Sequence, residues 1–417
     1  MATTDTRRRR ALFVDDEQRV LDAQRRILRD RRETWDLTFA LGGEMALKEL
    51  AAARYDVLVT DMRMPGVDGA ALLTHVVNRW PGTVRVVLSG QTDMGFALRA
   101  VRVAHQFFAK PCDAAILHAV LDRADRLTTM IADDALRGAV AAAGALPSQP
   151  SVVDALERAV AEPEPASGPL ARIVEQDSAL IAKLLQLANS SFFGLPRGVT
   201  TVEQATSYLG VHVLRDLVHA GAIGGPADLP IVAPGFSLDA HQRRARYTAR
   251  LARRIMEGTP FASDAFCAGM LHDVGELLIA TCDPEFYAAA RARTAAGTPL
   301  SEAELAERGV THATLGAFLL ELWGLPPRIV EAVHWHHTPA VSGATVLDLP
   351  GAVHIADVLI REALATAAAS GDGGLECLPW PAGALPALNA EYLTDVGVTD
   401  RIDGWRFEAR TIIAADR

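Results

Sequence analysis

Several side chains in about the first quarter of the chain are of the types that phosphoryl transfer requires. The adjacent acids Asp15 and Asp16, a third acid at Asp61, the hydroxyl of Ser89 and the ammonium of Lys110 each follow a short apolar run. Three carboxylates brought together have raised pKa values unless a cation lies among them, and hard oxygen ligands suit Mg²⁺. In-line phosphoryl transfer depends mostly on positioning and charge neutralisation, so a carboxylate nucleophile, Mg²⁺ and an ammonium group suffice. These residues therefore predict a magnesium-dependent phosphoacceptor site.

Such a site needs a scaffold that brings the ends of several strands together. Apolar runs alternate with amphipathic segments at the start of the chain, and we interpret residues 12–14, 37–40, 57–59, 84–88 and 106–109 as strands. This alternation predicts an α/β domain, a doubly wound five-stranded parallel sheet with helices on both faces. Such a sheet collects functional groups at the C-terminal ends of its strands, where the side chains above are expected.

The rest of the chain has the pattern of an all-helical domain. Apolar residues recur at three- and four-residue spacing in 181–188, 251–256, 266–279 and 317–323, and Gly and Pro lie in the gaps. We expect the α/β domain at 10–126, a helical linker at 127–137, an all-α bundle at 138–345 and a C-terminal helical extension and tail at 346–417. One helix from near Asp113 to as far as Leu136 should include the linker, and the Gly/Pro/Ala-rich residues 370–386 should form a loop.

Composition narrows the classes of function. No uninterrupted apolar stretch reaches the roughly 18 residues of a membrane-spanning helix, and the N-terminus has no secretory core, so we expect a cytoplasmic protein. The net charge of -10 argues against a nucleic-acid surface. Two basic runs, at 7–10 and 243–250, are expected to be solvated tails or faces. The four cysteines form no CxxC pair, which suits reduced thiols.

About the first quarter of the chain resembles the receiver domain of response regulators. The sequence DMRMP at 61–65 with DG at 68–69 is similar to the loop after the phosphorylated aspartate of that family, and FAKP at 108–111 is similar to its lysine–proline step. The resemblance implies a cis peptide bond before Pro111 and a sensor histidine kinase as partner. It also implies a role for each site residue: Asp61 accepts the phosphoryl group, Asp15, Asp16 and Asp61 hold Mg²⁺, Lys110 pairs with the phosphate, Ser89 senses it, and Phe107 is the aromatic switch.

Helix or loop capping is the alternative explanation of these acids. It would account for Asp16 or Asp113 singly, but not for the whole set.

Response regulators often dimerise through the receiver, and a long helix after Asp113 would permit a homodimer.

Residues from about 136 to 345 resemble the HDOD domain of bacterial signalling proteins. The similar stretches are DSALIAKLLQLANSSFFG at 177–194, TVEQATSYLGVHVLRDL at 201–217, MLHDVG at 270–275 and WGLP at 323–326. The family is an HD-type scaffold usually described as having lost catalysis. The resemblance therefore implies an output module that binds a downstream protein or a nucleotide ligand.

A second resemblance in the same region points to metal chemistry. Seven residues follow the order and approximate spacing of the metal ligands of HD-GYP phosphodiesterases, and imidazoles with carboxylates suit Fe, Mn or Zn. Two such ions could activate a water for attack on a phosphodiester. The seven are His241, His272, Asp273, His312, His336, His337 and Asp357.

Two observations oppose hydrolysis, and a third opposes a centre that both His336 and His337 face. Glu276 stands where the active enzymes carry a lysine, and an extra anion would repel a phosphate. The sequence TPA at 338–340 replaces the stretch that leads to their GYP tripeptide. His336 and His337 would point roughly 100° apart on a continuous helix. Two hypotheses thus remain: a phosphorylation-controlled binding module without a reaction of its own, and a phosphorylation-controlled metal phosphohydrolase acting on a cyclic dinucleotide or another phosphoester.

Overall fold

The computed structural model describes residues 8–90, 99–190, 198–221, 223, 233–369 and 384–416. The N-terminal domain is built on a five-stranded parallel sheet of order β2-β1-β3-β4-β5. This order confirms the predicted doubly wound sheet and places the C-terminal ends of β1 and β3 side by side. Every residue of β3 is buried, as a central strand covered on both faces requires. The strands are β1 (Arg9–Asp15), β2 (Trp35–Leu41), β3 (Val57–Asp61), β4 (Val84–Ser89) and β5 (Gln106–Ala109).

The helices of this domain are α1 (Gln18–Ile27), α2 (Gly43–Ala52), α3 (Gly69–Arg79) and α5 (Ala114–Met130). Two of them begin at an aspartate that caps free backbone amides. Asp68 accepts a hydrogen bond from the backbone N of Ala71 at 2.8 Å, and Asp113 accepts one from Ile116 at 2.9 Å. Asp113 is therefore a cap, which leaves the other acids to be explained.

The prediction of one helix as far as Leu136 is wrong. α5 ends at Met130, and a separate helix, α6 (Asp134–Ala142), begins four residues later. The cause is Asp133, whose carboxylate accepts hydrogen bonds from Ala135 N at 2.8 Å and Leu136 N at 3.1 Å and so starts a new helix. The buried Arg85 then holds α6 against the sheet through a 2.6 Å bond from Nη2 to Ala141 O.

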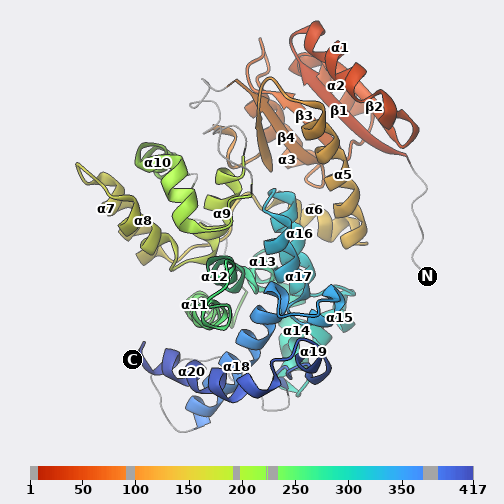
Figure 1. Ribbon diagram of the computed structural model, residues 1–417. Helices are drawn as coiled ribbons and strands as arrows, with labels where there is room; N and C mark the ends of the chain where they lie inside the picture. Colours follow the sequence, from red (N-terminus) through yellow and green to blue (C-terminus); the bar gives the residue numbers. More distant parts are fainter. Residues whose placement is uncertain are drawn as a thin grey trace.

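An all-helical domain follows, as predicted (Figure 1). Its central helices approach closely because small residues lie between them. A Cβ added to Gly275 would lie 1.9 Å from the carbonyl oxygen of His312, so only glycine fits where α13 crosses α16. The helices are α7 (Pro150–Ala161), α8 (Ser167–Val174), α9 (Ser178–Ala188), α10 (Val202–His219), α11 (Leu238–Ile255), α12 (Ala262–Leu271), α13 (Val274–Cys282), α14 (Pro284–Ala295), α15 (Leu300–Arg308), α16 (His312–Leu322) and α17 (Pro327–Trp335).

The C-terminal residues belong to the same bundle. They form α18 (Leu349–Ala369), α19 (Ala390–Asp395) and α20 (Ile402–Ala414), and α20 packs on α18 and α11. Tyr247 of α11 donates a hydrogen bond to Asp416 at 3.0 Å. Most of the loop predicted at 370–386 lies outside the described residues.

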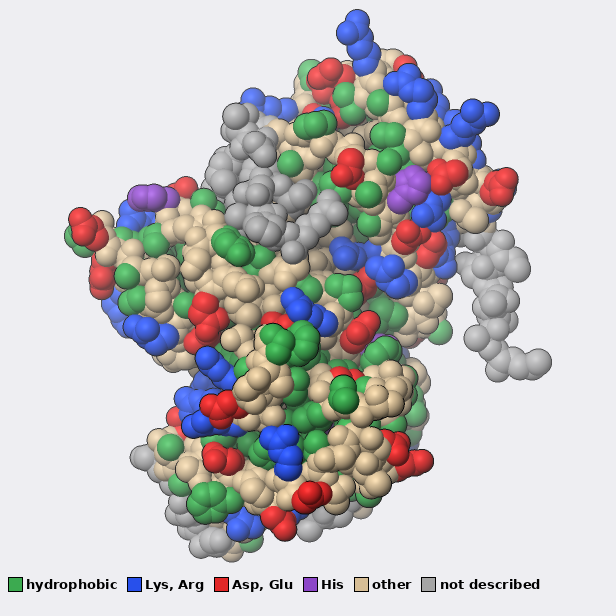
Figure 2. All heavy atoms as spheres, in the orientation of Figure 1, with side chains coloured by type: hydrophobic (Ala, Val, Ile, Leu, Met, Phe, Trp, Pro, Cys, Tyr) green, Lys and Arg blue, Asp and Glu red, His purple; other side chains and the backbone are tan. Residues whose placement is uncertain are grey.

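One stretch, Ala262–Cys282, is long and apolar enough to cross a membrane by length and composition alone. It spans α12 and α13, and 83% of its most apolar window is buried inside the fold. Burial of this kind marks a core segment. On the face shown in Figure 2, basic and acidic side chains are interspersed over the described residues, as the low net charge suggests.

Candidate functional site

The first site lies at the C-terminal edge of the sheet, where β1 and β3 end. Asp15, Asp16 and Asp61 each offer a carboxylate oxygen, and these oxygens all lie within 4.8 Å of one another. Lys110, after β5, places its Nζ 2.7 Å from Asp15 Oδ2 and 2.9 Å from Asp61 Oδ2. The structure thus brings together the three acids and the ammonium group that the sequence singled out. Their oxygen donors fit a Mg²⁺ ion.

The charges of this site favour the binding of a cation. Burial raises the pKa of Asp61, and the negative charge of Asp15 adds to that effect, while Lys110 and the amide of Met62 oppose it. Burial alone would lower the pKa of Lys110, but its bonds to Asp15 and Asp61 outweigh burial and raise it. One ammonium therefore compensates only part of the acidic cluster, which leaves room for a divalent ion.

The two expected relay residues lie on the neighbouring strands. Ser89 ends β4 and is fully buried, and its carbonyl oxygen accepts a hydrogen bond from Lys110 N at 2.8 Å. Phe107 lies in β5 and is 2% exposed, so its ring is in the inward position. The peptide bond between Lys110 and Pro111 is cis, as the resemblance implied.

The second cluster is buried in the helical domain and centres on Asp273. Its carboxylate lies 3.3 Å from His272 Nε2, 3.2 Å from His312 Nε2 and 3.8 Å from His336 Nε2. Asp357 of α18 also contacts His272 Nε2, at 3.2 Å. Side chains from α12, α16, α17 and α18 thus meet at the Asp273 turn, and none of these residues is more than 1% exposed.

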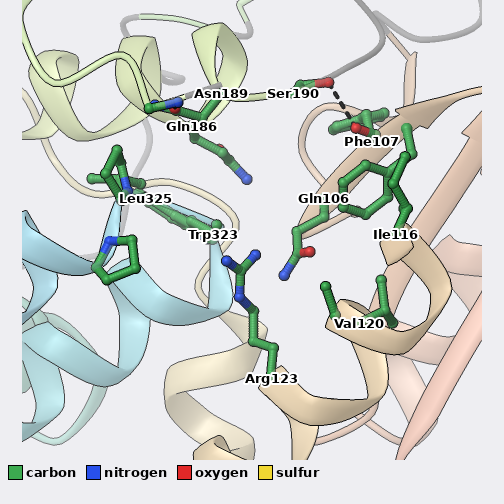
Figure 3. A pocket seen from close by; sticks show the side chains of 16 residues that line it. Gln106, Phe107, Ile116, Val120, Arg123, Gln186, Asn189, Ser190, Trp323 and Leu325 are labelled. Carbon is green, nitrogen blue, oxygen red and sulfur yellow. Dashed lines mark hydrogen bonds between the residues drawn. The ribbon is translucent and has the colours of Figure 1, made fainter. Parts of the chain in front are cut away.

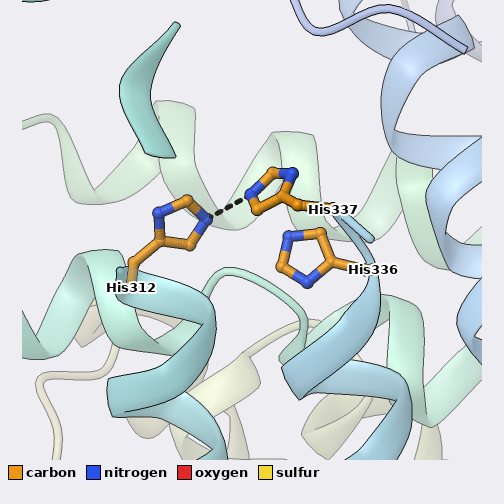
Figure 4. Close-up of side chains that lie close together, drawn as sticks. All are labelled: His312, His336 and His337. Atoms are coloured by element: carbon orange, nitrogen blue, oxygen red, sulfur yellow. Dashed lines mark hydrogen bonds between the residues drawn. The ribbon is translucent and has the colours of Figure 1, made fainter. Parts of the chain in front are cut away.

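Three imidazoles form one half of this cluster (Figure 4). His336 donates from Nδ1 to the carbonyl oxygen of Val333 at 2.7 Å, and its Nε2 has no hydrogen bond in the described part of the chain. His337 Nε2 lies 2.9 Å from His312 Nε2. The helix ends at Trp335, so the expectation that His336 and His337 diverge as on a continuous helix is wrong.

Two buried arginines, which the sequence analysis missed, fill the other half. Arg361 reaches Asp273 Oδ2 and Asp357 Oδ1, both at 2.7 Å. Arg244 reaches Asp273 Oδ2 at 2.9 Å and also pairs with Glu276. The expectation that the basic run at 243–250 is solvated is therefore wrong for Arg244, which is 5% exposed. Helical spacing was the available signal, because Arg361 follows Asp357 by four residues and Arg244 follows His241 by three.

His241 does not join the other six candidate ligands. Its Nδ1 lies 3.7 Å from Glu276 Oε2, and neither ring nitrogen has a hydrogen bond among the described residues. Glu276 is not the uncompensated anion that the sequence suggested. Burial would raise its pKa, but Arg244 outweighs burial and lowers it.

The protonation states follow from these contacts. Burial alone would lower the pKa of both His272 and His312, but neighbouring carboxylates raise them to about 9 and about 10. For His312 the main carboxylate is Glu304, which accepts from its Nδ1 at 2.7 Å. Burial and the charge of His272 instead lower the pKa of His336 to about 3. At neutral pH, His272 and His312 are therefore cations and His336 is neutral.

The acids of the cluster are matched in number by basic side chains. The four acids are Asp273, Glu276, Glu304 and Asp357, and the four cations are Arg244, Arg361, His272 and His312.

The donor set fits one divalent ion better than two. His336 Nε2 and Asp273 Oδ1 have no hydrogen bonds in the described residues. His336 lies with His312 and His337, and Asp273 Oδ1 lies 3.2 Å from His312 Nε2 and 3.8 Å from His336 Nε2. On the opposite side the guanidinium of Arg361 bridges the two carboxylates that a second ion would need.

The two domains are joined by hydrogen bonds to the backbone of β5 and to the residue before it. Gln186 of α9 donates to His105 O at 2.8 Å, and Ser190 donates from Oγ to Phe107 O at 2.9 Å. In return, Gln106 of β5 donates to Leu322 O at the end of α16, at 2.9 Å. The hydroxyl of Ser190 is thus used in the contact between the two domains.

Charged groups extend the contact on both sides. Glu321 of α16 accepts from Arg126 Nη2 at 2.6 Å and from Arg123 Nε at 3.3 Å. Lys183 of α9 donates to Val101 O at 2.8 Å and to Gly144 O at 3.0 Å. The helical domain therefore rests on the edge of the sheet that carries Phe107 and leads to Lys110.

Two family models match the chain. The response regulator receiver domain matches residues 11–122, and the HDOD domain matches residues 146–339. Together they cover both the sheet with its acidic edge and most of the helical bundle.

Relatives share parts of this organisation. An uncharacterized protein of Treponema pallidum is 24% identical over 217 residues, which are 52% of this chain and 42% of that protein. The hydrogenase transcriptional regulatory protein HoxA of Cupriavidus necator is 37% identical over 102 residues, which are 24% of this chain and 20% of that protein. The crystal structure of the MmoQ response regulator from Methylococcus capsulatus covers 64% of this chain and 98% of its own, at 21% identity and a TM-score of 0.45. The chain spans less than half the length of these two curated relatives.

Proposed function

The chain is a response regulator in which a receiver domain precedes an HDOD domain, and we propose that phosphorylation of Asp61 controls the HDOD domain as a binding module. A sensor histidine kinase supplies the phosphoryl group. Asp15, Asp16 and Asp61 would hold Mg²⁺, which neutralises the incoming phosphoryl oxygens. Lys110 lies within 2.9 Å of both Asp15 and Asp61 and so can pair with the new charge.

The observation that carries this proposal is the set of bonds between the HDOD domain and β5. A phosphoryl group adds about two negative charges beside Lys110, and we expect it to draw in Ser89 and let Phe107 follow. The carbonyl oxygen of Phe107 accepts the bond from Ser190, so movement of that strand must strain or break the contact. A local charge event can in this way shift the balance between a docked and a released HDOD domain.

Charge compensation supports a binding role for the HDOD domain. A hydrolytic centre with two metals needs uncompensated carboxylates, but guanidinium groups already bridge Asp273, Glu276 and Asp357. A buried network of paired charges fixes the packing of α11, α13 and α18. The module would then act through its surface on a downstream protein or ligand.

One observation favours the second candidate, a metal-dependent phosphohydrolase. His336 Nε2 and Asp273 Oδ1 make no hydrogen bond among the described residues, and His312, His336 and His337 would offer donor atoms to a single Fe, Mn or Zn ion beside that carboxylate. Such an ion would supply Lewis-acid chemistry toward a phosphoester. It would also compete with the proton on His312.

Labelling with acetyl phosphate tests the phosphoacceptor. The wild-type protein should be labelled in the presence of Mg²⁺, and Asp61→Asn should abolish labelling. Asp68→Asn is the matched control, because Asp68 is an acid on the same edge that caps α3 and pairs with Arg99 but does not contact the cluster of Asp15, Asp61 and Lys110. Labelling that persists in Asp61→Asn would refute the assignment of Asp61.

Hydrogen exchange of the labelled protein tests the coupling. Phosphorylation should speed exchange in β5 and α9. Equal exchange in the labelled and unlabelled protein would show that phosphorylation of Asp61 is not coupled to the docking of the HDOD domain.

Metal analysis and a hydrolysis assay decide between the two candidates. The binding module predicts no turnover of a phosphodiester by protein purified without chelator and supplied with Mn²⁺ or Zn²⁺. Metal-dependent turnover that is lost in both Asp273→Ala and His336→Gln would establish the hydrolase instead. His336→Gln is needed because Asp273→Ala leaves two buried arginines unpaired, whereas His336 makes no ion pair shorter than 3.8 Å.

A further inference from the structure

A cavity of about 350 Å³ lies between the two domains (Figure 3). The receiver contributes Phe107, Val120 and Arg123 to its wall, and the HDOD domain contributes Gln186, Trp323 and Leu325. Ligand pockets have volumes from roughly 300 Å³ upward and are common at domain interfaces. This cavity therefore has the size and position of a site for one small molecule.

Arg123 gives the cavity a positive charge. Its Nε contacts Glu321 at 3.3 Å, but its two terminal nitrogens have no hydrogen-bond partner in the described part of the chain. Figure 3 shows the guanidinium directed into the cavity. Burial lowers the pKa of Arg123 more than Glu321 raises it, so the cation is incompletely compensated. A guanidinium of this kind is suited to bind a carboxylate through two parallel hydrogen bonds.

The rest of the wall is mostly apolar and includes aromatic rings. Trp323 is 2% exposed, and Lys183 Nζ lies 5.3 Å from the centroid of its ring. Phe107 and Val120 line the opposite side. A flat apolar body fits between such walls better than a sugar or a polar chain.

Two carboxamide oxygens in the wall lack partners. Gln106 and Gln186 use their nitrogens for the interdomain bonds, and their Oε1 atoms have no hydrogen bond among the described residues. A buried acceptor without a partner is energetically unfavourable. These oxygens are shielded, so a small rotation of the carboxamide would be needed for either to accept a bond from an O–H or N–H on a ligand ring.

We propose that this interdomain cavity binds a small aromatic carboxylate that carries a hydroxyl or N–H donor on its ring. The carboxylate pairs with Arg123, and the ring lies between Trp323 and Phe107. Both domains form the wall, so the ligand binds the docked arrangement and stabilises it. Resting on the proposed function, this linkage makes the ligand an opponent of release by phosphorylation. The binding itself does not depend on phosphorylation.

Ligand-observed NMR titrations of the unphosphorylated full-length protein test the site. The probes are 4-hydroxyphenylacetate and its neutral analogue 4-hydroxyphenylacetamide. The acid should bind saturably and at least tenfold more tightly than the amide, and Arg123→Gln should remove that preference. Arg102→Gln is the matched control, because Arg102 also crosses the interface, donating to Gly221 O at 3.1 Å, but does not line the cavity.

Three results would overturn the proposal. They are no saturable binding of the acid at millimolar concentration, equal affinity for acid and amide, and equal losses in Arg123→Gln and Arg102→Gln. Labelling of Asp61 is measured separately. Failure of this site therefore leaves the proposed function standing, and failure of labelling leaves the binding result intact.

Discussion

Removing the charge of Glu321 should weaken the contact between the domains. Glu321 is 5% exposed and joins α16 to Arg123 and Arg126 of α5. The side chain of Arg126 is 57% exposed, so solvent screens its pair and limits its share to about 0–1 kcal/mol. Arg123 is mostly buried, but its bond is long at 3.3 Å, so its share should lie near the lower end of the roughly 1.5–3 kcal/mol of a charged hydrogen bond.

Glu321→Gln should therefore cost about 1.5–2.5 kcal/mol in docking, which lowers the docking equilibrium constant by roughly 10- to 60-fold. Hydrogen exchange of β5 and α9 measures this shift, because their protection includes the interdomain contact. Glu362→Gln is the matched control, since Glu362 pairs with Arg406 at 3.0 Å outside the interface. Unchanged exchange in Glu321→Gln, or an equal change in Glu362→Gln, would refute the view that this pair holds the domains together.

Three further predictions concern buried groups. Burial lowers the pKa of Lys183 to about 7 from its ordinary 10.5, so docking releases a proton. Docking should therefore strengthen as pH rises between those values, by at most about 1.4 kcal/mol per pH unit. Hydrogen exchange measured across that range should show this pH dependence of docking in the wild-type protein but not in Lys183→Met. Gly275→Ala should lower the free energy of unfolding by several kcal/mol, measured by urea titration, because its Cβ would lie 1.9 Å from the carbonyl oxygen of His312. Arg361→Gln should destabilise the fold by about 3–5 kcal/mol, because Asp273 and Asp357 lose their shared cation; a melting temperature equal to wild type would contradict this.

The receiver fold was predictable because its signals are local. Each strand is a short apolar run, and each chemical group directly follows a strand, so the topology alone brings Asp15, Asp61 and Lys110 together. The break at Asp133 was missed for a local reason too. Ala, Leu and Arg on both sides favour helix, and only a side chain that caps Ala135 and Leu136 turns this one pattern into two helices.

The helical cluster was only partly predictable because its energetics are not local. The order of the histidines identifies candidate ligands, but sequence order does not show which charges share a buried site. Arg361 and Arg244 lie on α18 and α11, and only their packing around Asp273 brings two buried guanidinium groups among the candidate ligands. An arginine four residues from an aspartate on a helix usually forms an ion pair on the surface. Only the burial of Arg361 and Asp357 makes this pair part of the core.

The position of the interface limits how the receiver can signal. The HDOD domain is bonded to backbone oxygens at His105 and Phe107, so substitution of those side chains would leave the acceptors in place. Backbone bonds of 2.8–2.9 Å tolerate only small displacements before they weaken. A rearrangement of β5 must therefore either carry α9 with it or break from it. The same strand leads within three residues to Lys110, which pairs with Asp15 and Asp61 and is the group that we expect to meet the phosphoryl charge. The output domain is thus attached where the receiver is expected to move most, which favours two discrete arrangements over a graded response.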